Sequence, residues 1–247
     1  MNFQEFDAAL EQMFVLNESP LRLQENQRKQ LFEAMNIILE KNKVMNLTAI
    51  CSENEFIARH WVDALTAVDL IPQGASLLDV GTGGGILAIA YAVARPDIKV
   101  LAMDSTAKKT DFVAECAAKL GLKNLRVISG RAEELSKDKK FRESFDVVTA
   151  RAVAAMPVLS ELCLPFAKVG GIFCALKGKN GAEELAQAAE AIKKLGGRLK
   201  EDKFISLREI SGGDVISSDR HLLIIEKNSK TPEIYPRRYA QITKSPL

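Results

Sequence analysis

The stretch that most constrains the fold runs from Leu77 to Gly85, where an apolar segment ends in an acidic residue and then in glycines. Its sequence is Leu-Leu-Asp-Val-Gly-Thr-Gly-Gly-Gly, and an apolar run at 86–94 follows directly. A buried strand that passes through glycines into a helix places a ligand site at the carboxyl end of the strand. Glycines let the backbone pass close to a ligand, and the unpaired N–H groups of the next helix point at it. The stretch therefore predicts an α/β fold with a nucleoside or nucleotide site.

Asp79 separates the two ligand classes that use such a turn. A carboxylate beside the glycines repels the pyrophosphate of a dinucleotide but attracts the sulfonium and ammonium groups of S-adenosylmethionine. The dinucleotide pattern also needs a third glycine or an alanine where this chain has Ile86. The alternating glycines of the turn are Gly81, Gly83 and Gly85. We predict that these residues bind S-adenosylmethionine, and an NAD-dependent oxidoreductase is the least favoured alternative.

Strand and helix patterns alternate from Ser76 onward, which indicates a mostly parallel sheet with helices on both faces. Apolar segments predict seven strands, at 76–80, 100–103, 125–129, 146–149, 172–176, 204–207 and 222–226. Helices are predicted between them, at 86–94, 107–120, 158–166 and 182–195. Seven strands with a final hairpin-like pair are expected of a class I methyltransferase, a Rossmann-like α/β fold.

Three parts of the chain differ in pattern. Residues 1–70 are predicted to be a helical addition, with a second helix that begins at Ser52 in a capping-box sequence. Residues 71–227 are predicted to form the methyltransferase domain. Residues 228–247 are polar, with a net charge of +3 from four basic residues against one acidic residue. This segment is expected to be a basic tail rather than a packed element.

Composition excludes several classes of protein. The net charge is +2, so any contact with nucleic acid needs a local basic patch. The longest apolar run has nine residues, far below the ~18 needed to span a bilayer, and the N-terminus lacks the pattern of a signal peptide. No Cys-x-x-Cys pair occurs, so neither a metal nor a disulfide framework is expected. The four cysteines are expected to be core thiols of a cytoplasmic protein.

Two further strand ends carry polar residues that suit a nucleoside. Asp104 ends the second strand, where its carboxylate can accept hydrogen bonds from both ribose hydroxyls. The alternative is a helix cap, and the two roles are compatible. Ala132 and Glu133 follow the third strand, where they can contact the adenine edge or form an exposed polar loop.

Arg151 follows the fourth strand, where the methyl acceptor is expected to lie. The Asn/Asp-Pro-Pro-Tyr sequence that accepts protons from exocyclic amines is absent there, and no cysteine lies in these loops to attack a pyrimidine. A site without a proton acceptor suits guanine N7, which carries no proton, and an arginine fork matches guanine O6 and N7. We predict Arg151 as the catalytic residue; the alternative is an ion pair with a neighbouring carboxylate.

Other polar residues are candidates for weaker roles. His60 and Asp63 lie one helical turn apart and are expected to form a structural hydrogen bond away from the strand-end rim. Basic residues after the fifth strand and in the tail are candidates for phosphate contacts, although exposed lysines are commonly just solvated. The predicted RNA-binding residues are Lys177, Lys179, Arg237, Arg238 and Lys244.

In this order, the motifs resemble those of the glucose-inhibited division protein B family, the bacterial small-subunit rRNA guanine-N7 methyltransferases. The likeness covers nearly the whole chain, and its most specific parts are Asn46-Leu47-Thr48-Ala49-Ile50 and Tyr235-Pro236-Arg237-Arg238. The resemblance implies methylation of guanine N7 in 16S rRNA, as naked rRNA or a small-subunit assembly intermediate, by a monomer. The cofactor contacts that it implies are Gly81, Ile86, the Ala132-Glu133 pair and Arg151.

The chain departs from this family at two places. Ile86-Leu87-Ala88 stands where a bulky apolar residue, proline and glycine are usual, and Ala240 and Ile242 replace a glycine and a proline of the C-terminal segment. The alternatives to rRNA methylation are a methyltransferase with a non-RNA substrate and a non-catalytic, ribosome-associated RNA-binding protein on the same fold.

Overall fold

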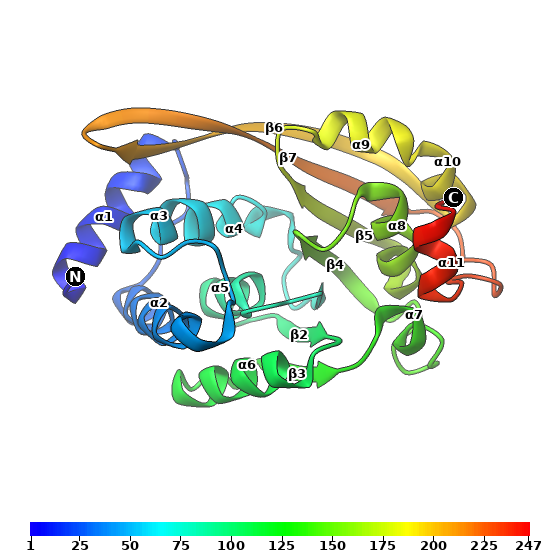
Figure 1. The fold of residues 1–247 in the computed structure, drawn as a ribbon, viewed down its shortest axis with the longest axis horizontal. Coiled ribbons are helices and arrows are strands. Elements are labelled where there is room, and N and C mark those ends of the chain that lie inside the picture. The colour runs from blue at the N-terminus through cyan, green and yellow to red at the C-terminus, as the bar shows by residue number, and fades with distance from the viewer.

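The computed structural model describes residues 1–247 and contains one sheet with helices on both faces (Figure 1). The strand order is β3-β2-β1-β4-β5-β7-β6. The five strands from β3 to β5 are parallel, and β7 is antiparallel to both of its neighbours. The strands are β1 (Ser76–Val80), β2 (Lys99–Asp104), β3 (Leu125–Ser129), β4 (Phe145–Arg151), β5 (Ala167–Lys177), β6 (Gly197–Ser211) and β7 (Asp214–Lys227). The predicted fold class is confirmed.

All seven predicted strands are present, but the last two are much longer than their predicted segments. Apolar residues mark only the middle of each strand, where it packs in the sheet. Beyond this middle, β6 and β7 pair with each other in a long hairpin whose outer residues are exposed. Exposed strand residues have no need to be apolar, so the sequence pattern could not show them.

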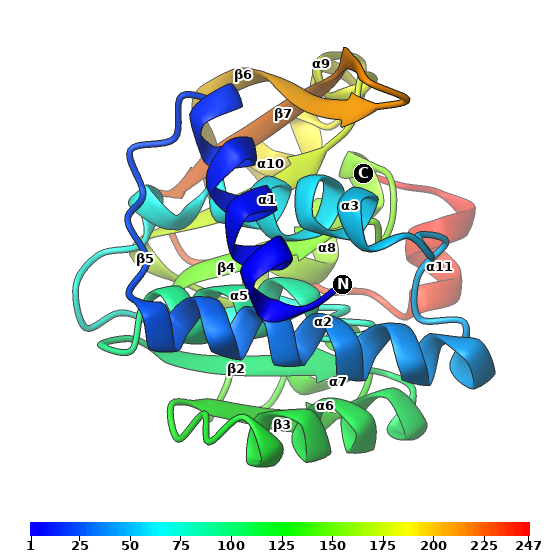
Figure 2. The same ribbon diagram turned by 90° about the vertical axis from the view of Figure 1, so that its left-hand side faces the viewer.

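Successive residues of the central strands point to opposite faces of the sheet, so each strand contributes side chains to two hydrophobic cores, one on each face. Leu77 packs in the core with the N-terminal helices, and Leu78 packs in the core on the other face. The first face holds α1 (Phe3–Leu16), α2 (Glu25–Met45), α5 (Ile86–Ala94) and α6 (Ala107–Lys119) (Figure 2). The second holds α7 (Ala132–Leu135), α8 (Met156–Cys163), η3 (Leu164–Phe166), α9 (Gly181–Gln187), α10 (Ala189–Lys194) and α11 (Tyr239–Lys244).

A helix from Glu53 to Leu65 packs against α1 and α5 and contains a widened turn. It consists of α3 (Glu53–Phe56), the π-helical segment η1 (Ile57–Val62) and α4 (Asp63–Leu65), and η2 (Val68–Leu70) follows. The backbone N–H of Glu55 donates to the Ser52 side chain, so the predicted helix start is confirmed. The N–H of Asp63 reaches back five residues to a carbonyl, which marks the π turn. Such turns are often found at functional sites.

The prediction that residues 228–247 form an unpacked tail is wrong. Helix α11 lies beside α8 (Figure 1). The Ile242 side chain of α11 is fully buried, and Thr231 is also buried. The Arg237 guanidinium pairs with the Glu161 carboxylate, which is fully buried. Arg142 donates to three backbone carbonyls of the segment 231–235. These partners lie far away in the sequence, so local composition gave no sign of them.

Two further predictions concern cysteines and membranes. Cys116, Cys163 and Cys174 are buried, as predicted, but Cys51 is exposed in the loop before α3, so the core assignment is wrong for this one. None of the helices combines the length and the apolar character needed to cross a membrane.

Candidate active site

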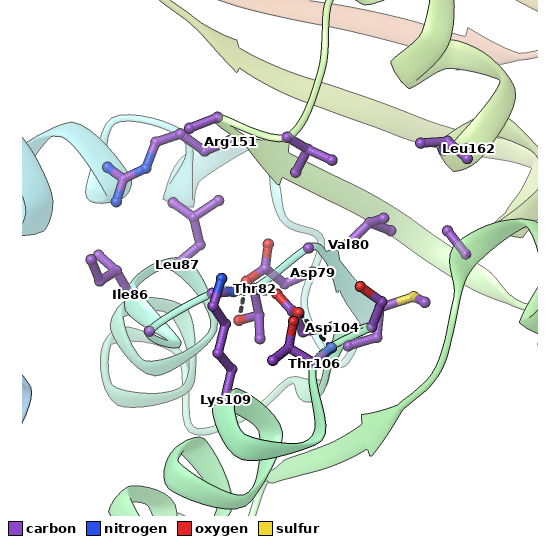
Figure 3. A pocket seen from close by; sticks show the side chains of 18 of the residues that line it. Asp79, Val80, Thr82, Ile86, Leu87, Asp104, Thr106, Lys109, Arg151 and Leu162 are labelled. Carbon is purple, nitrogen blue, oxygen red and sulfur yellow. Dashed lines mark hydrogen bonds between the residues drawn. The ribbon is translucent and has the colours of Figure 1, made fainter. Parts of the chain in front are cut away.

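A cavity of about 570 Å³ lies at the carboxyl ends of the first four strands (Figure 3). This volume lies within the ~300–1,000 Å³ that is usual for ligand sites. Its walls come from the glycine turn after β1, the end of β2 and the start of α6, the loop after β3, the end of β4, α8, α11, the π-helical segment and the segment 47–49. The carboxyl ends of the strands therefore lie beside groups from segments that are far apart in the chain.

The glycine turn forms one wall of the cavity, and its backbone requires glycine. Gly83 has φ of 56°, in the left-handed region, and a Cβ there would meet no atom within 4 Å because the position faces open space. Gly81 also lines the cavity, but Gly85 does not. A Cβ at Gly85 would come within 2.9 Å of Val113, so this glycine allows α5 to pack on α6. The predicted cofactor contact at Gly85 is therefore replaced by a packing role.

Asp79 is a buried carboxylate at the bottom of the cavity. Its side chain accepts a hydrogen bond of 2.7 Å from the Thr82 hydroxyl, and only 1% of the residue is exposed. Burial raises the pKa of Asp79 to about 6, because the charged form loses its water. A cationic ligand group in the cavity would stabilise the charged form, which fits the ammonium group of S-adenosylmethionine.

Asp104 connects the glycine turn to the start of α6. Its two carboxylate oxygens accept hydrogen bonds from the backbone N–H groups of Gly83 (3.0 Å) and Thr106 (2.9 Å). Thr106 is the N-cap residue of α6, so Asp104 supports the turn before the helix and is not the cap itself. Asp104 also lines the cavity, and each carboxylate oxygen has a further lone pair for a ribose hydroxyl.

Ala132 and Glu133 lie opposite, in the first turn of α7, and both line the cavity. The alternative of an exposed loop is wrong for Glu133, which is 7% exposed. Beside them, Tyr239 of α11 also lines the cavity, and the Arg131 guanidinium lies 5.7 Å from the centre of its ring. Sequence analysis missed Tyr239, because its position depends on how the C-terminal segment packs.

Arg151 joins two elements at the rim of the cavity. Its Nη1 donates to Asp63 Oδ2 at 2.6 Å, and Asp63 Oδ1 accepts at 2.9 Å from Arg220 Nε. The ion-pair alternative for Arg151 is therefore present, and the residue also lines the cavity. Arg151 and Arg220 thus share the carboxylate of Asp63, which is the first residue of α4 and directly follows the π-helical segment.

The predicted hydrogen bond between His60 and Asp63 is absent, and His60 lies in the cavity wall rather than away from the rim. Its Nε2 lies 2.7 Å from the Thr48 hydroxyl, and its Nδ1 lies 3.4 Å from Nη2 of Arg151. Burial, and then the positive charge of Arg151, lower the pKa of His60 to about 3. The imidazole is therefore neutral at physiological pH. The π turn places these partners, which the sequence spacing could not show.

The five predicted RNA-binding residues divide into two groups. Lys177 pairs with Glu184 at 2.6 Å and is 10% exposed, and Arg237 pairs with buried Glu161. Both are internal ion pairs. Exposed basic side chains remain at Lys179, Arg238 and Lys244.

A seven-stranded sheet in this order, with a glycine turn after the first strand and a carboxylate at the end of the second, defines a class I S-adenosylmethionine-dependent methyltransferase. Two solved structures share the fold. A methyltransferase in complex with the Trm112 activator of Haloferax volcanii has a TM-score of 0.56 and 17% identity, over 78% of this chain and 98% of that chain. The precorrin-6y C5,15-methyltransferase of Geobacter metallireducens has a TM-score of 0.52 and 16% identity, over 67% and 86%.

Sequence comparison shows the family. Residues 27–210 match the family described as rRNA small subunit methyltransferase G. A relative of that name from Pelotomaculum thermopropionicum is 44% identical over 90% of this chain and 92% of its own length. Another, from Brevibacillus brevis, is 39% identical over 94% and 96%. The chain belongs to the rRNA small subunit methyltransferase G family.

Proposed function

We propose that this chain transfers a methyl group from S-adenosylmethionine to N7 of a guanine in small-subunit (16S) rRNA. Family membership supports the rRNA substrate and the methyl donor. The atom specificity rests on one observation at the end of β4. The polar groups there are a guanidinium, which cannot lose its proton, a carboxylate that already accepts from two arginines, and an imidazole whose pKa is lowered to about 3. An acceptor with no proton to lose suits such a site.

The residues of the site act chiefly by positioning the reactants. S-adenosylmethionine, when bound, supplies an electrophilic methyl group and a positive charge that passes to the base. N7 attacks with its single in-plane lone pair, so Arg151 cannot hold N7 as well and donates to guanine O6 instead. Asp63 accepts from one edge of the Arg151 guanidinium, and the neutral His60 ring lies 3.4 Å from Nη2 of the same group.

We further propose that the enzyme acts as a monomer in the cytoplasm, where its rRNA substrate is assembled into ribosomal subunits. The substrate is either the naked rRNA or an assembly intermediate. Incubation of the purified enzyme and labelled donor with each of these, prepared from cells that lack the gene, distinguishes the two.

The decisive experiment maps N7-methylguanine in 16S rRNA from cells with and without the gene. One guanine should lose its methyl group without the gene and regain it when the parent gene is returned. The Gly83→Val variant should not restore it, because its side chain would enter the open space that Gly83 faces, and its left-handed backbone disfavours a branched residue. An unchanged N7-methylguanine pattern, with label entering a metabolite or protein, would overturn the proposal.

A further inference from the structure

A second cavity, of about 330 Å³, opens beside the donor cavity. It lies at the ends of β4 and β5 and beside Arg220 of β7, because the antiparallel pairing of β5 and β7 brings Lys177 opposite His221. The two cavities share His60, Arg151 and Ala152 in their walls. A group held in the second cavity therefore lies directly beside a group held in the first.

Two arginines that line the second cavity, Arg151 and Arg220, share a single carboxylate. Asp63 is 5% exposed and is the only carboxylate that pairs with either Arg151 or Arg220, so one negative charge faces two positive ones. Lys177, in contrast, is neutralised by Glu184. This imbalance favours an anionic group in the cavity.

One N–H group of the Arg220 guanidinium has no hydrogen-bond acceptor in the protein. Its Nε donates to Asp63 and its Nη1 to the carbonyl of Asp219, whereas its Nη2 has no acceptor within the protein. The side chain is 24% exposed and borders the cavity. Leu176 and Leu222 add apolar wall in the same cavity, which suits the faces of a base.

We propose that the second cavity is the acceptor-nucleotide pocket and that Arg220 binds the phosphate of the nucleotide whose base is methylated. This inference rests on the proposed function. A base in this pocket is out of its stack, either flipped from a helix or taken from a single-stranded segment. Arg151 then lines the boundary that the donor and acceptor sites share, and Arg220 holds the phosphate of the acceptor nucleotide.

Arg220→Gln tests the phosphate contact, with Arg198→Gln as the matched control. Arg198 also pairs with a carboxylate of the hairpin, but it is 71% exposed and lies outside both cavities. Loss of a charge-assisted hydrogen bond should raise the KM for rRNA about 10- to 100-fold. The salt slope of RNA binding should fall by about 0.7, while S-adenosylhomocysteine affinity stays unchanged. The control should change none of these.

Gly178→Phe tests the pocket without touching any charge. Gly178 lines the second cavity but not the first, and a Cβ there meets no atom within 4 Å, so the cavity wall has room for a ring at this position. Methyl transfer should be lost with donor affinity retained, whereas Asn180→Phe, outside the cavity, should stay active. A fully active Gly178→Phe enzyme, or an Arg220→Gln enzyme with unchanged KM and salt slope, overturns the inference. A parent enzyme that methylates no rRNA overturns the proposed function instead.

Discussion

The buried carboxylate of Asp79 makes donor binding sensitive to pH. Its pKa of about 6 in the free protein means that it is protonated in mildly acidic solution. The ammonium group of the ligand needs the charged form, so affinity should be full above about pH 6 and fall as pH decreases below it. Calorimetric titration with S-adenosylhomocysteine between about pH 5 and pH 8 measures this dependence.

Asp79→Asn is the control for this prediction. The amide is nearly isosteric but does not titrate, so affinity should be lower at neutral pH and flat across the same range. The raised pKa also has a consequence for the free protein. Native Asp79 binds its proton more tightly than the unfolded carboxyl does, so its contribution to stability falls as pH rises from about 4 to about 6. An affinity that stays constant below pH 6 in the parent would show that Asp79 does not contact the ligand's cation.

Arg151→Lys should impair methyl transfer although the positive charge is kept. Lysine lacks the planar fork that lets Arg151 pair with Asp63 and still donate to a ligand. The single-turnover rate at saturating RNA and donor is the measurement. His60→Gln should reduce this rate only as far as it loosens Arg151, because the imidazole is neutral and is not the base.

The pH profile of the same step separates the two mechanisms. With both substrates saturating, the parent rate should show no essential ionisation near neutrality. A rate that collapses below a pKa near 6.5 in the parent, and loses this dependence in His60→Gln, would make His60 a general base. The acceptor would then be a group that must lose a proton, and not guanine N7.

At the scale of elements, the strands whose carboxyl ends line the cavity could be predicted most closely. We call this end of the sheet the active edge. β1 and β3 have their predicted bounds, since short buried strands between turns carry an uninterrupted apolar signal. The same strands place Asp79 and the glycine turn in the cavity. The pairing of Asp63 with Arg151 and Arg220 could not be predicted, because it joins segments 88 and 157 residues apart in the chain.

The C-terminal segment should be a structural part of the domain. Arg237→Met would leave the buried Glu161 carboxylate without its charged partner and should destabilise the protein by roughly 3 kcal/mol. Arg238→Met, at the exposed neighbouring position, should have little effect. Urea unfolding of both variants measures the difference. Equal free energies of unfolding would mean that the ion pair between Arg237 and Glu161 does not stabilise the packed segment.

The same segment should contribute to donor binding through Tyr239. If its ring covers the adenine, Tyr239→Ala should weaken S-adenosylhomocysteine binding about tenfold, in line with base–aromatic stacking of roughly 1–3 kcal/mol. Tyr239→Phe keeps the ring and should bind almost as the parent does. Calorimetry with the parent and the two variants tests whether the ring stacks on the adenine. If the ring makes no contact with the ligand, all three affinities should agree.

At the scale of the whole molecule, the net charge of +2 is too small to attract RNA by itself. RNA affinity must depend on where the exposed basic residues lie. Lys179 follows β5 at the active edge, and Arg238 adjoins Tyr239 in the cavity wall, with Lys244 at the end of the same helix. These three residues extend the active edge outward with positive charge, whereas Lys177 and Arg237 are held in internal ion pairs.

Replacement of these three residues by glutamine should therefore lower RNA affinity and its dependence on salt. Each lost phosphate contact should reduce the logarithmic salt slope by roughly 0.7–0.9. The control is the same change of charge at Lys99, Lys123 and Lys194, which are exposed at the opposite edge, where β2, β3 and β6 begin. Donor affinity should be unchanged in both triple variants. If both lower the salt slope equally, RNA is attracted by overall charge, and the active edge has no special part in holding it.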